Sequence, residues 1–357
     1  MKIGIVGLPN AGKSTLFNAL TAAGAQTGDY PFTTVEPNVA IAAVPDDRLG
    51  QVGATVGSSE LVPVSIAFHD IAGLVRGASE GEGLGNRFLG SIRETDVICH
   101  VVRCHLESGV PHPDGRVDPA ADIETIETEL LLADFEQAER RLERVVKQAR
   151  SGDPEAVAER DWLEQIRDAL AAGRPARSVA PPETAPDAPR LLSALTSKPV
   201  LYVANTDDES QAVPQPVAAH AAGADAAAVA VSARLEAELA ELEPAEAEEM
   251  RASYGVEESG LERLVSAAYE LLGLITFFTA DQGKEAMARP LRRGATAWQA
   301  AGEVHTEIQQ RFVKAEVIPW QDLVECGGFV AARDRGLLRI EGRDYVVADG
   351  DVVHIRT

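Results

Sequence analysis

The N-terminal stretch 1–20, MKIGIVGLPNAGKSTLFNAL, predicts a strand, a glycine-containing loop and a helix, in that order. Residues 2–6 form a short apolar run that suits a buried parallel strand, and residues 15–20 repeat apolar side chains at helical spacing. Between them lies Gly-x-x-x-x-Gly-Lys-Ser, in which Gly7 and Gly12 let backbone N–H groups point inward at phosphates. The stretch therefore predicts a phosphate-binding loop at the start of an α/β sheet.

The side chains of this loop carry specific expectations. Lys13 would reach the terminal phosphates of a nucleotide, and the Ser14 hydroxyl would bind Mg²⁺. A chance glycine turn is the alternative, and the flanking strand and helix disfavour it. The predicted nucleotide contacts of the loop are Asn10, Ala11, Gly12, Lys13, Ser14 and Thr15.

Two later segments indicate a nucleotide-dependent switch. The stretch 28–39, GDYPFTTVEPNV, places Thr34 in a loop where a hydroxyl would complete the metal shell once the γ-phosphate is present. An apolar strand then ends at Asp70, which would hold Mg²⁺ through water, and the Gly73 N–H would contact the γ-phosphate. An Asp-x-x-Gly turn is common by itself, but its position after a phosphate loop favours the functional interpretation.

Residues 122–150 predict a long helix, because apolar residues recur in steps of four and three. The break at 151–154 contains a glycine, then Asp and Pro, which suit a helix end and a new helix start. An antiparallel hairpin follows, with 174–190 as a Pro- and Ala-rich return linker; its charged faces are either solvated or a partner surface. The predicted seam residues are Leu131, Phe135, Ala138, Leu142, Val145, Ala149, Leu163, Ile166 and Leu170.

The sheet resumes at 200–204 and ends in Asn-Thr-Asp-Asp, where a GTPase carries its base-recognition loop. That loop in a GTPase is Asn-Lys-x-Asp, whose aspartate accepts hydrogen bonds from guanine, but here Thr206 replaces the lysine. Asp208 keeps the guanine interpretation open. The predicted contacts at this end of the site are Asn205, Thr206, Asp208, Ser232 and Ala233.

The C-terminal residues 275–357 predict a separate β-grasp unit. A strand starts at Thr276, 295–312 has the pattern of one amphipathic helix, and the final stretch alternates through a turn at Asp349 and Gly350. Arginines gather here against an acidic background, as local RNA contacts or as ordinary solvated charges. They are Arg289, Arg292, Arg293, Arg333, Arg335, Arg339 and Arg343.

Composition limits the remaining classes. A formal net charge of −23 over 357 residues disfavours broad adhesion to nucleic acid or anionic membrane, so an RNA contact must be local. The three cysteines form no pairing framework and fit a reducing compartment. No apolar run has the length of a membrane span. We expect a cytoplasmic protein without a membrane partner.

Several longer motifs carry a family resemblance. GLPNAGKSTLFNALT at 7–21, DIAGLVRGASEGEGLGNRFL at 70–89, YVAN at 202–205 and GATAWQAAGEVHTEI at 294–308 together resemble the Obg-like ATPases of the YchF type. The resemblance spans nearly the whole chain. It implies a P-loop switch domain that prefers ATP to GTP, interrupted by a coiled-coil hairpin, and followed by a TGS domain.

The resemblance also implies boundaries and partners. The nucleotide-binding domain would comprise 1–121 and 191–274, the hairpin and linker 122–190, and the TGS domain 275–357. The family associates with the ribosome, through the large subunit or the intact particle, and a monomer is expected. ATP and Mg²⁺ would be its ligands.

Hydrolysis in such a protein proceeds without the usual water-orienting glutamine, since Leu74 occupies the position after Gly73. Two candidates remain. Asn10 resembles an asparagine that helps bind K⁺ in related proteins, and the ion would supply positive charge to the transition state. His112 resembles a family histidine proposed to act in hydrolysis, and its imidazole would orient or deprotonate water. An ordinary exposed loop histidine is the alternative.

These observations predict a cytoplasmic, Mg²⁺-dependent, ribosome-associated ATPase. An Obg-group GTPase that recognises guanine through Asp208 is the first alternative. The second is a nucleotide-gated ribosome-binding module whose hydrolysis is incidental.

Overall fold

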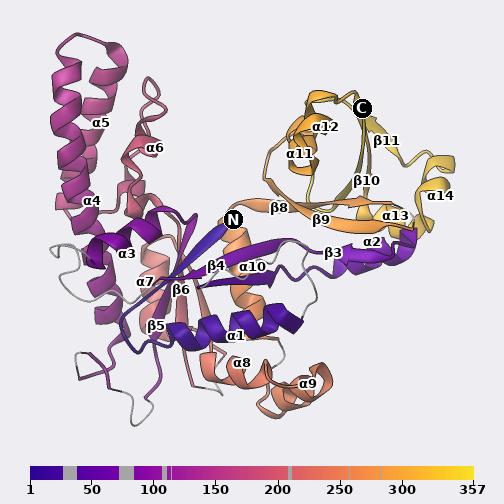
Figure 1. Cartoon of the computed structure of the whole chain (residues 1–357), viewed down its shortest axis with the longest axis horizontal. Coiled ribbons are helices and arrows are strands. Elements are labelled where there is room, and N and C mark those ends of the chain that lie inside the picture. Colours follow the sequence, from indigo (N-terminus) through magenta and orange to yellow (C-terminus); the bar gives the residue numbers. More distant parts are fainter. Residues whose placement is uncertain are drawn as a thin grey trace. The chain divides into compact units, whose positions relative to one another are not determined.

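The computed structural model describes residues 1–26, 38–71, 84–106, 111–113, 115–207, 211–256, 258–281 and 283–357. The chain forms two compact units (Figure 1). The first comprises Met1–Ile41 with Ala67–Ala267, and the second Ala42–Ile66 with Ala268–Thr357. Within the described residues, no helix combines the length and apolarity needed to cross a membrane.

The first unit is built on a sheet with strand order β2-β4-β1-β5-β6-β7. Pairing is parallel between β1 and both its neighbours, between β5 and β6, and between β6 and β7. The strands predicted over residues 2–6, up to Asp70 and over 200–204 are confirmed. The near-continuous apolar runs of the first and last of these suit strands covered on both faces. The strands are β1 (Lys2–Val6), β2 (Val39–Ala43), β4 (Ser65–Asp70), β5 (Val97–Arg103), β6 (Val200–Asn205) and β7 (Ala227–Val231).

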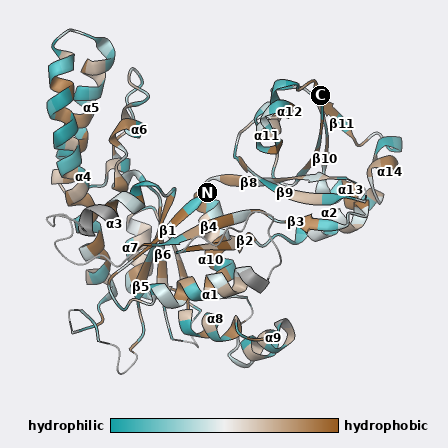
Figure 2. Cartoon of the chain, viewed as in Figure 1, coloured by the Kyte–Doolittle hydropathy of each residue, from teal (hydrophilic) through white to brown (hydrophobic). Residues whose placement is uncertain are grey.

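Helices surround this sheet, and Figure 2 shows apolar residues concentrated in the strands of the first unit. The sheet places the phosphate loop at the carboxyl end of β1, directly before α1, as the sequence predicts. Outside the hairpin and its return segment, the described helices of this unit are α1 (Lys13–Gln26), α3 (Leu84–Arg93), α7 (Gln215–Gly223), α8 (Ala233–Leu239), α9 (Pro244–Ser253) and the start of α10 (Gly260–Leu271).

The predicted hairpin is confirmed as α4 (Pro119–Ala149) and α5 (Pro154–Ala171). The first helix begins slightly before the predicted range, because the Asp118 side chain accepts a hydrogen bond from the Ala121 N–H at 3.3 Å and caps it. Its predicted seam packs on the returning helix. The shared core includes Ala138, Leu142, Val145, Leu163 and Ile166.

The return segment 174–190 packs more closely than the predicted linker. It contains a short 3₁₀ turn, η1 (Ala176–Ser178), and leads into α6 (Ala188–Leu192). Ala176, Ala185 and Ala188 are buried in the hairpin core. The alanine-rich composition that predicted a linker therefore reflects small residues that pack against α4 and α5. A second 3₁₀ turn, η2 (Leu195–Ser197), follows, and its backbone N–H groups donate to the buried carboxylate of Asp134.

The second unit contains a mixed sheet with strand order β11-β10-β12-β8-β9-β3. Its outer strand β3 comes from the N-terminal third of the chain and pairs in parallel with β9. Residues 42–66, which also supply α2 (Asp47–Val56), thus belong to this unit, a contribution that the sequence analysis missed. The strands are β3 (Glu60–Val62), β8 (Leu274–Ala280), β9 (Glu285–Arg292), β10 (Lys314–Pro319), β11 (Arg339–Glu341) and β12 (Asp351–Arg356).

The single helix predicted over 295–312 is wrong, because the chain breaks it into α11 (Ala297–Val304) and α12 (Thr306–Gln310). His305 adopts an extended conformation with φ −169°, and its Nδ1 accepts a hydrogen bond from the Glu307 N–H at 3.2 Å, which caps the second helix. The first helix packs its alanines on Phe277, Val317 and Val353 of the sheet, the arrangement of a β-grasp unit. Two further helices are α13 (Trp320–Cys326) and α14 (Phe329–Asp334).

Candidate functional site

The loop between β1 and α1 has a backbone that requires its glycines. Gly12 has φ 97°, and a Cβ built there would lie 2.1 Å from the Asn205 Nδ2 atom. A Cβ on Gly7, with φ 154°, would lie 2.4 Å from the Val101 carbonyl oxygen. Side chains at either position would clash, so the loop closes tightly on the neighbouring strands. Asn10, with φ 64°, also adopts the left-handed conformation.

Lys13 and Asp70 lie together beneath this loop. The Lys13 side chain is buried, with 8% of the residue exposed, and its ammonium donates to the Leu8 carbonyl oxygen at 2.8 Å. Burial lowers the pKa of Lys13, although the charge of Asp70 opposes that shift. Burial likewise raises the pKa of Asp70, and Lys13 opposes it. Lys13 and Asp70 therefore carry opposite charges that partly offset the cost of burying each other, near the carboxyl ends of β1 and β4.

Asp70 has a buried oxygen, Oδ1, that receives no hydrogen bond from the described residues. A buried carboxylate oxygen without a donor is costly unless a ligand or water satisfies it. The Ser14 residue is exposed at the start of α1, after the same loop. Oxygen donors of this kind fit a hydrated Mg²⁺ ion, which prefers carboxylate, hydroxyl and water ligands.

Asn205 connects the loop after β6 to the phosphate loop. Its Nδ2 donates to the Ala11 carbonyl oxygen at 3.0 Å, and its Oδ1 accepts from the Ala233 N–H at 3.1 Å. Ser232 caps α8 by accepting from the Leu235 N–H at 3.2 Å. The structure thus joins Asn205 to the phosphate loop and to Ala233 at the start of α8, the helix that Ser232 caps.

Thr206, which replaces the lysine of a guanine-recognition loop, is 5% exposed. Its backbone N–H donates to the Val231 carbonyl oxygen at 3.1 Å and joins the loop to β7. The predicted site residues Thr34, Gly73 and Asp208, and Leu74 with them, lie outside the described residues.

The segment around His112 is held from two sides. The Asn10 side chain donates through Nδ2 to the Pro111 carbonyl oxygen at 2.9 Å. The His112 Nε2 lies 3.0 Å from Asp122 Oδ2, and both side chains are only 5% exposed. An exposed loop histidine is therefore the wrong description. The sequence analysis did not name Asp122 as the partner of His112, although its place in the first turn of α4, ten positions after the histidine, was a usable signal.

These features define a class. A glycine loop between a parallel strand and a helix, a buried lysine beside a strand-end aspartate, and a second loop joined to the first by asparagine are the parts of a P-loop nucleoside triphosphatase of the GTPase-like switch type. Residues 2–145 match the family model MMR_HSR1, described as "50S ribosome-binding GTPase". Residues 274–357 match YchF-GTPase_C, described as "Protein of unknown function (DUF933)".

Whole-chain relatives narrow the class to a family. A Bacillus subtilis protein named "Ribosome-binding ATPase YchF" is 46% identical, and the match covers 99% of this chain and 98% of the relative. A protein of the same name from Escherichia coli O157:H7 is 45% identical over the same shares. A solved structure described as "Structure of the Schizosaccharomyces pombe YchF GTPase" matches with TM-score 0.88 and 32% identity, covering 100% of this chain and 97% of that one. The chain belongs to the YchF family.

Proposed function

We propose that this chain is an Mg²⁺-dependent ATPase that works as a ribosome-associated switch in the cytoplasm. The observation that carries the proposal is the joined pair of loops: Asn205 connects the loop after β6 to a phosphate loop that contains a buried lysine. The names of the bacterial relatives support ATP as the nucleotide and the ribosome as the partner.

The phosphate end of the site follows from the residues that converge there. Lys13 and the backbone N–H groups of residues 10–15 would hold the phosphates, with Gly73 at the γ-phosphate. Ser14, Thr34 and Asp70 would hold Mg²⁺, the last through water that fills its buried acceptor. The ion would neutralise charge on the β- and γ-phosphates.

The base end of the site supports adenine over guanine. The Asn205 amide braces the loops through one donated and one accepted hydrogen bond, and its remaining N–H would be available to the nucleotide. Thr206 is too short to lie along the base as the lysine of a GTPase does, so the guanine-recognition loop is incomplete. Asp208 leaves a GTPase as the alternative, and the fission yeast relative is itself called a GTPase. Ser232 and Ala233 would complete the base contacts.

Hydrolysis would use His112. If the Asp122 carboxylate accepts a hydrogen bond from Nε2–H, the neutral imidazole carries its lone pair on Nδ1. The imidazole would then orient or deprotonate the attacking water. K⁺ at the phosphate loop would use Asn10 Oδ1, because the amide nitrogen of this residue donates to Pro111.

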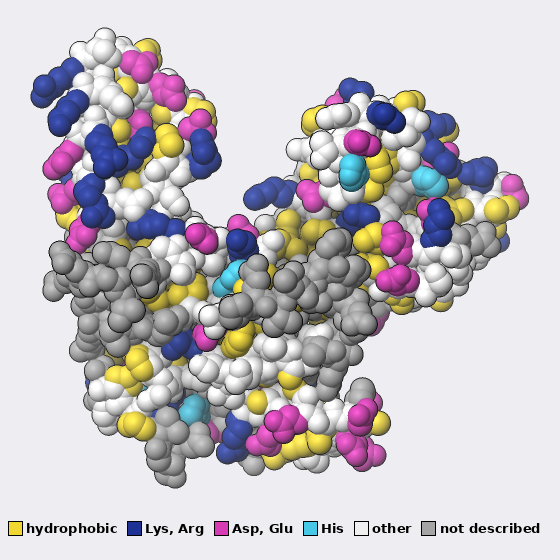
Figure 3. Space-filling view, viewed as in Figure 1, with side chains coloured by type: hydrophobic (Ala, Val, Ile, Leu, Met, Phe, Trp, Pro, Cys, Tyr) yellow, Lys and Arg dark blue, Asp and Glu magenta, His cyan; other side chains and the backbone are white. Residues whose placement is uncertain are grey.

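Basic side chains on the hairpin support a local RNA contact. Arg140, Arg144 and Lys147 are spaced four and three apart on α4, which puts them on one face. Figure 3 shows Lys and Arg side chains along the hairpin, and others on the second unit, where the C-terminal arginines lie. These cations would contact phosphates of the ribosomal RNA, on the large subunit or on the intact particle. The protein would bind as a monomer.

Hydrolysis by the full chain tests the proposal. Lys13→Ala should keep the fold and weaken Mg²⁺–ATP binding by at least about ten-fold, since a buried phosphate-binding cation is lost. Lys2→Ala, at an exposed lysine on the same strand-loop-helix segment, is the matched control and should bind normally. Normal single-turnover hydrolysis in Lys13→Ala would refute the assignment.

The second candidate function is a nucleotide-gated ribosome-binding module, in which ribosome binding is the function and hydrolysis is incidental. Co-sedimentation with ribosomes in ATP and in ADP, each at low and high salt, distinguishes this module from an ATPase switch. The amount of bound protein would differ between ATP and ADP in a salt-sensitive way. If that difference persists in a His112→Ala variant that does not hydrolyse ATP, the binding module is favoured.

We keep 1–121 with 191–274, 122–190 and 275–357 as the proposed domains, with residues 42–66 adding a helix and an edge strand to the last of them. In this arrangement the hairpin is an insertion in the nucleotide-binding domain. Because residues 42–66 pack in the second unit, an isolated fragment of residues 275–357 should lack its edge strand β3.

A further inference from the structure

A cavity of about 670 Å³ lies at the opposite end of the first sheet from the phosphate loop. Its lining includes Ile98 and Val200, which stand at the amino ends of β5 and β6. The phosphate loop follows the carboxyl end of β1, and these strands run parallel. The cavity is therefore separate from the nucleotide site.

The floor of the cavity is apolar. Ile98, Leu130 and Leu195 are almost completely buried, and they belong to one hydrophobic cluster that Val200 packs against. Pro175 adds an apolar side wall. Small-molecule sites of about 300–1,000 Å³ commonly combine such a floor with a few polar groups.

One polar group is the carboxylate of Glu127, on α4. Its Oε1 accepts a hydrogen bond from the Tyr202 hydroxyl and lies 3.0 Å from His220 Nε2. Burial, reinforced by the charge of Glu127, raises the pKa of Tyr202, so its hydroxyl stays a donor. No described residue donates to Oε2 of Glu127. Two partners thus hold the carboxylate in place while leaving it an acceptor for a ligand.

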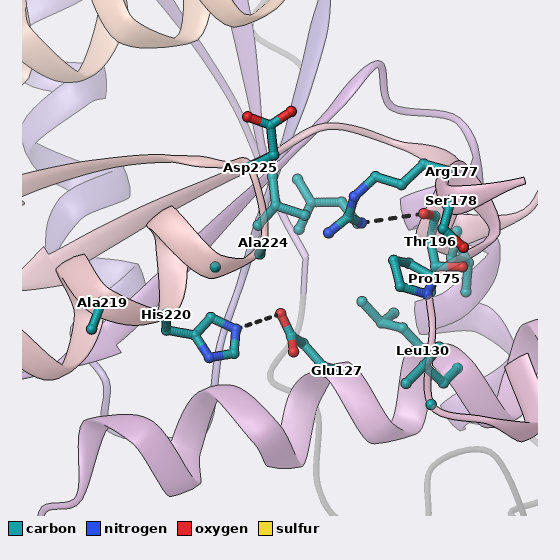
Figure 4. A pocket seen from close by; sticks show the side chains of 16 residues that line it. Glu127, Leu130, Pro175, Arg177, Ser178, Thr196, Ala219, His220, Ala224 and Asp225 are labelled. Carbon is teal, nitrogen blue, oxygen red and sulfur yellow. Dashed lines mark hydrogen bonds and ion pairs between the residues drawn. The ribbon is translucent and has the colours of Figure 1, made fainter. Parts of the chain in front are cut away.

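The other polar group is the guanidinium of Arg177, on the return segment. Its Nη1 donates to the Thr196 carbonyl oxygen at 3.2 Å, which fixes its direction. Its other N–H groups donate to no described residue. Figure 4 shows this guanidinium and the Glu127 carboxylate on either side of one space. Asp225 also lines the cavity but is exposed, so water screens its charge.

We propose that this cavity binds a free α-amino acid with a large apolar side chain. The ligand ammonium would donate to Glu127, and its carboxylate would accept from Arg177, whose planar fork suits carboxylates. The side chain would cover Ile98, Leu130 and Leu195. A zwitterion can pair with both groups at once, whereas a simple anion would pair only with Arg177 and a simple cation only with Glu127.

Titration calorimetry of the full chain with L-tryptophan, L-phenylalanine, L-leucine and L-alanine tests this ligand class. Affinity should fall along that series as less apolar surface is buried. Tryptamine, which lacks the carboxylate, and N-acetyl-tryptophan, which lacks the ammonium, should each bind at least about ten-fold more weakly than tryptophan.

Variants separate the two polar contacts. Arg177→Met, at an exposed position that should not disturb folding, and Glu127→Gln should each weaken tryptophan binding by about ten-fold or more. Arg174→Met, a neighbouring exposed arginine outside the lining, is the matched control and should leave it unchanged. Lys13→Ala should also leave it unchanged, because the nucleotide site is elsewhere.

Three results would overturn the proposal. The first is the absence of binding by any of the four amino acids up to about 10 mM. The second is tryptophan affinity that survives Arg177→Met and Glu127→Gln. The third is equal affinity for tryptamine and tryptophan, which would leave Arg177 without a role.

Discussion

The side-chain amide of Asn205 donates to the Ala11 carbonyl oxygen at 3.0 Å, so the loop after β6 and the phosphate loop are held as one piece. The same side chain accepts from the Ala233 N–H at 3.1 Å and adds the start of α8. Three segments that are far apart in sequence therefore depend on one buried amide. The geometry of the candidate nucleotide site rests on this contact.

Asn205→Ala should lower the free energy of unfolding by about 1–3 kcal/mol, because the Ala233 N–H and the Ala11 carbonyl lose a buried partner. ADP affinity should fall with it, since the two loops are no longer joined. Urea denaturation and calorimetry measure the two effects. Asn18→Ala, at an exposed position on α1, is the control. Equal stability in the two variants would contradict this role for Asn205.

Gly12→Ala should abolish nucleotide binding, because the new Cβ would lie 2.1 Å from Asn205 Nδ2 and φ is 97°. Gly50→Ala is the matched control: it lies within α2, where a Cβ meets nothing within 4 Å. That substitution should stabilise the protein by up to about 1 kcal/mol. Normal ADP binding by Gly12→Ala would show that the loop geometry is wrong.

Asp122→Asn should reduce the hydrolysis rate kcat by at least about ten-fold while ADP affinity stays unchanged, because Asn no longer fixes the proton on His112 Nε2. Nitrogen NMR of the histidine rings, assigned with His112→Gln, should show the Nε2–H tautomer in the unmodified chain and a changed tautomer in the variant.

Asp118→Asn is the control for this helix, since Asp118 caps α4 through the Ala121 N–H. It should keep the same tautomer and kcat, with at most about 1 kcal/mol of lost stability. An unchanged tautomer in Asp122→Asn would exclude the proposed role of Asp122 whether or not the chain hydrolyses ATP.

The pH dependence of stability should contain a contribution from His100, which is buried on β5. Burial lowers the pKa of His100 to about 3, and the charges of His220 and Lys13 add to the effect. Between pH 6.5 and about 3, His100 is protonated in the unfolded chain but not in the folded chain. The stabilising contribution is therefore complete above pH 6.5 and is lost as pH falls, at about 1.4 kcal/mol per pH unit.

Urea denaturation of the unmodified chain and His100→Gln at pH 7, 6 and 5 isolates this contribution. The difference in unfolding free energy between the two proteins should change by about the same 1.4 kcal/mol per unit below pH 6.5, in favour of the variant. A difference independent of pH would mean that His100 accepts a proton in the folded protein.

Local patterns predicted the parts of the fold whose partners are near in sequence. The phosphate loop has its strand and helix on either side, and the α4–α5 seam repeats over many turns, so both were confirmed. The break at His305 was missed because the apolar periodicity continues through it, and only the backbone φ reveals it.

Long-range pairings explain the other omissions. The pairing of Glu60 with Glu285 puts β3 into the second unit, and no pattern within three residues specifies a partner so distant. At the site, Asn205 was predicted as a nucleotide contact from its motif, but its bond to Ala11 depends on the closeness of two loops. The cavity beside Glu127 likewise has walls from α4, α7 and the return segment, which are far apart in the sequence.

Calorimetric titration of the full chain with ADP and with GDP, in Mg²⁺ and K⁺, measures which nucleotide the protein prefers. We expect at least about ten-fold tighter binding of ADP, because Thr206 leaves the guanine-recognition loop incomplete. The heat of ADP binding should be lost in the Lys13→Ala variant, which would show that ADP binds at the phosphate loop. Tighter binding of GDP than of ADP would contradict the ATPase assignment and make the chain a GTPase that recognises guanine through Asp208.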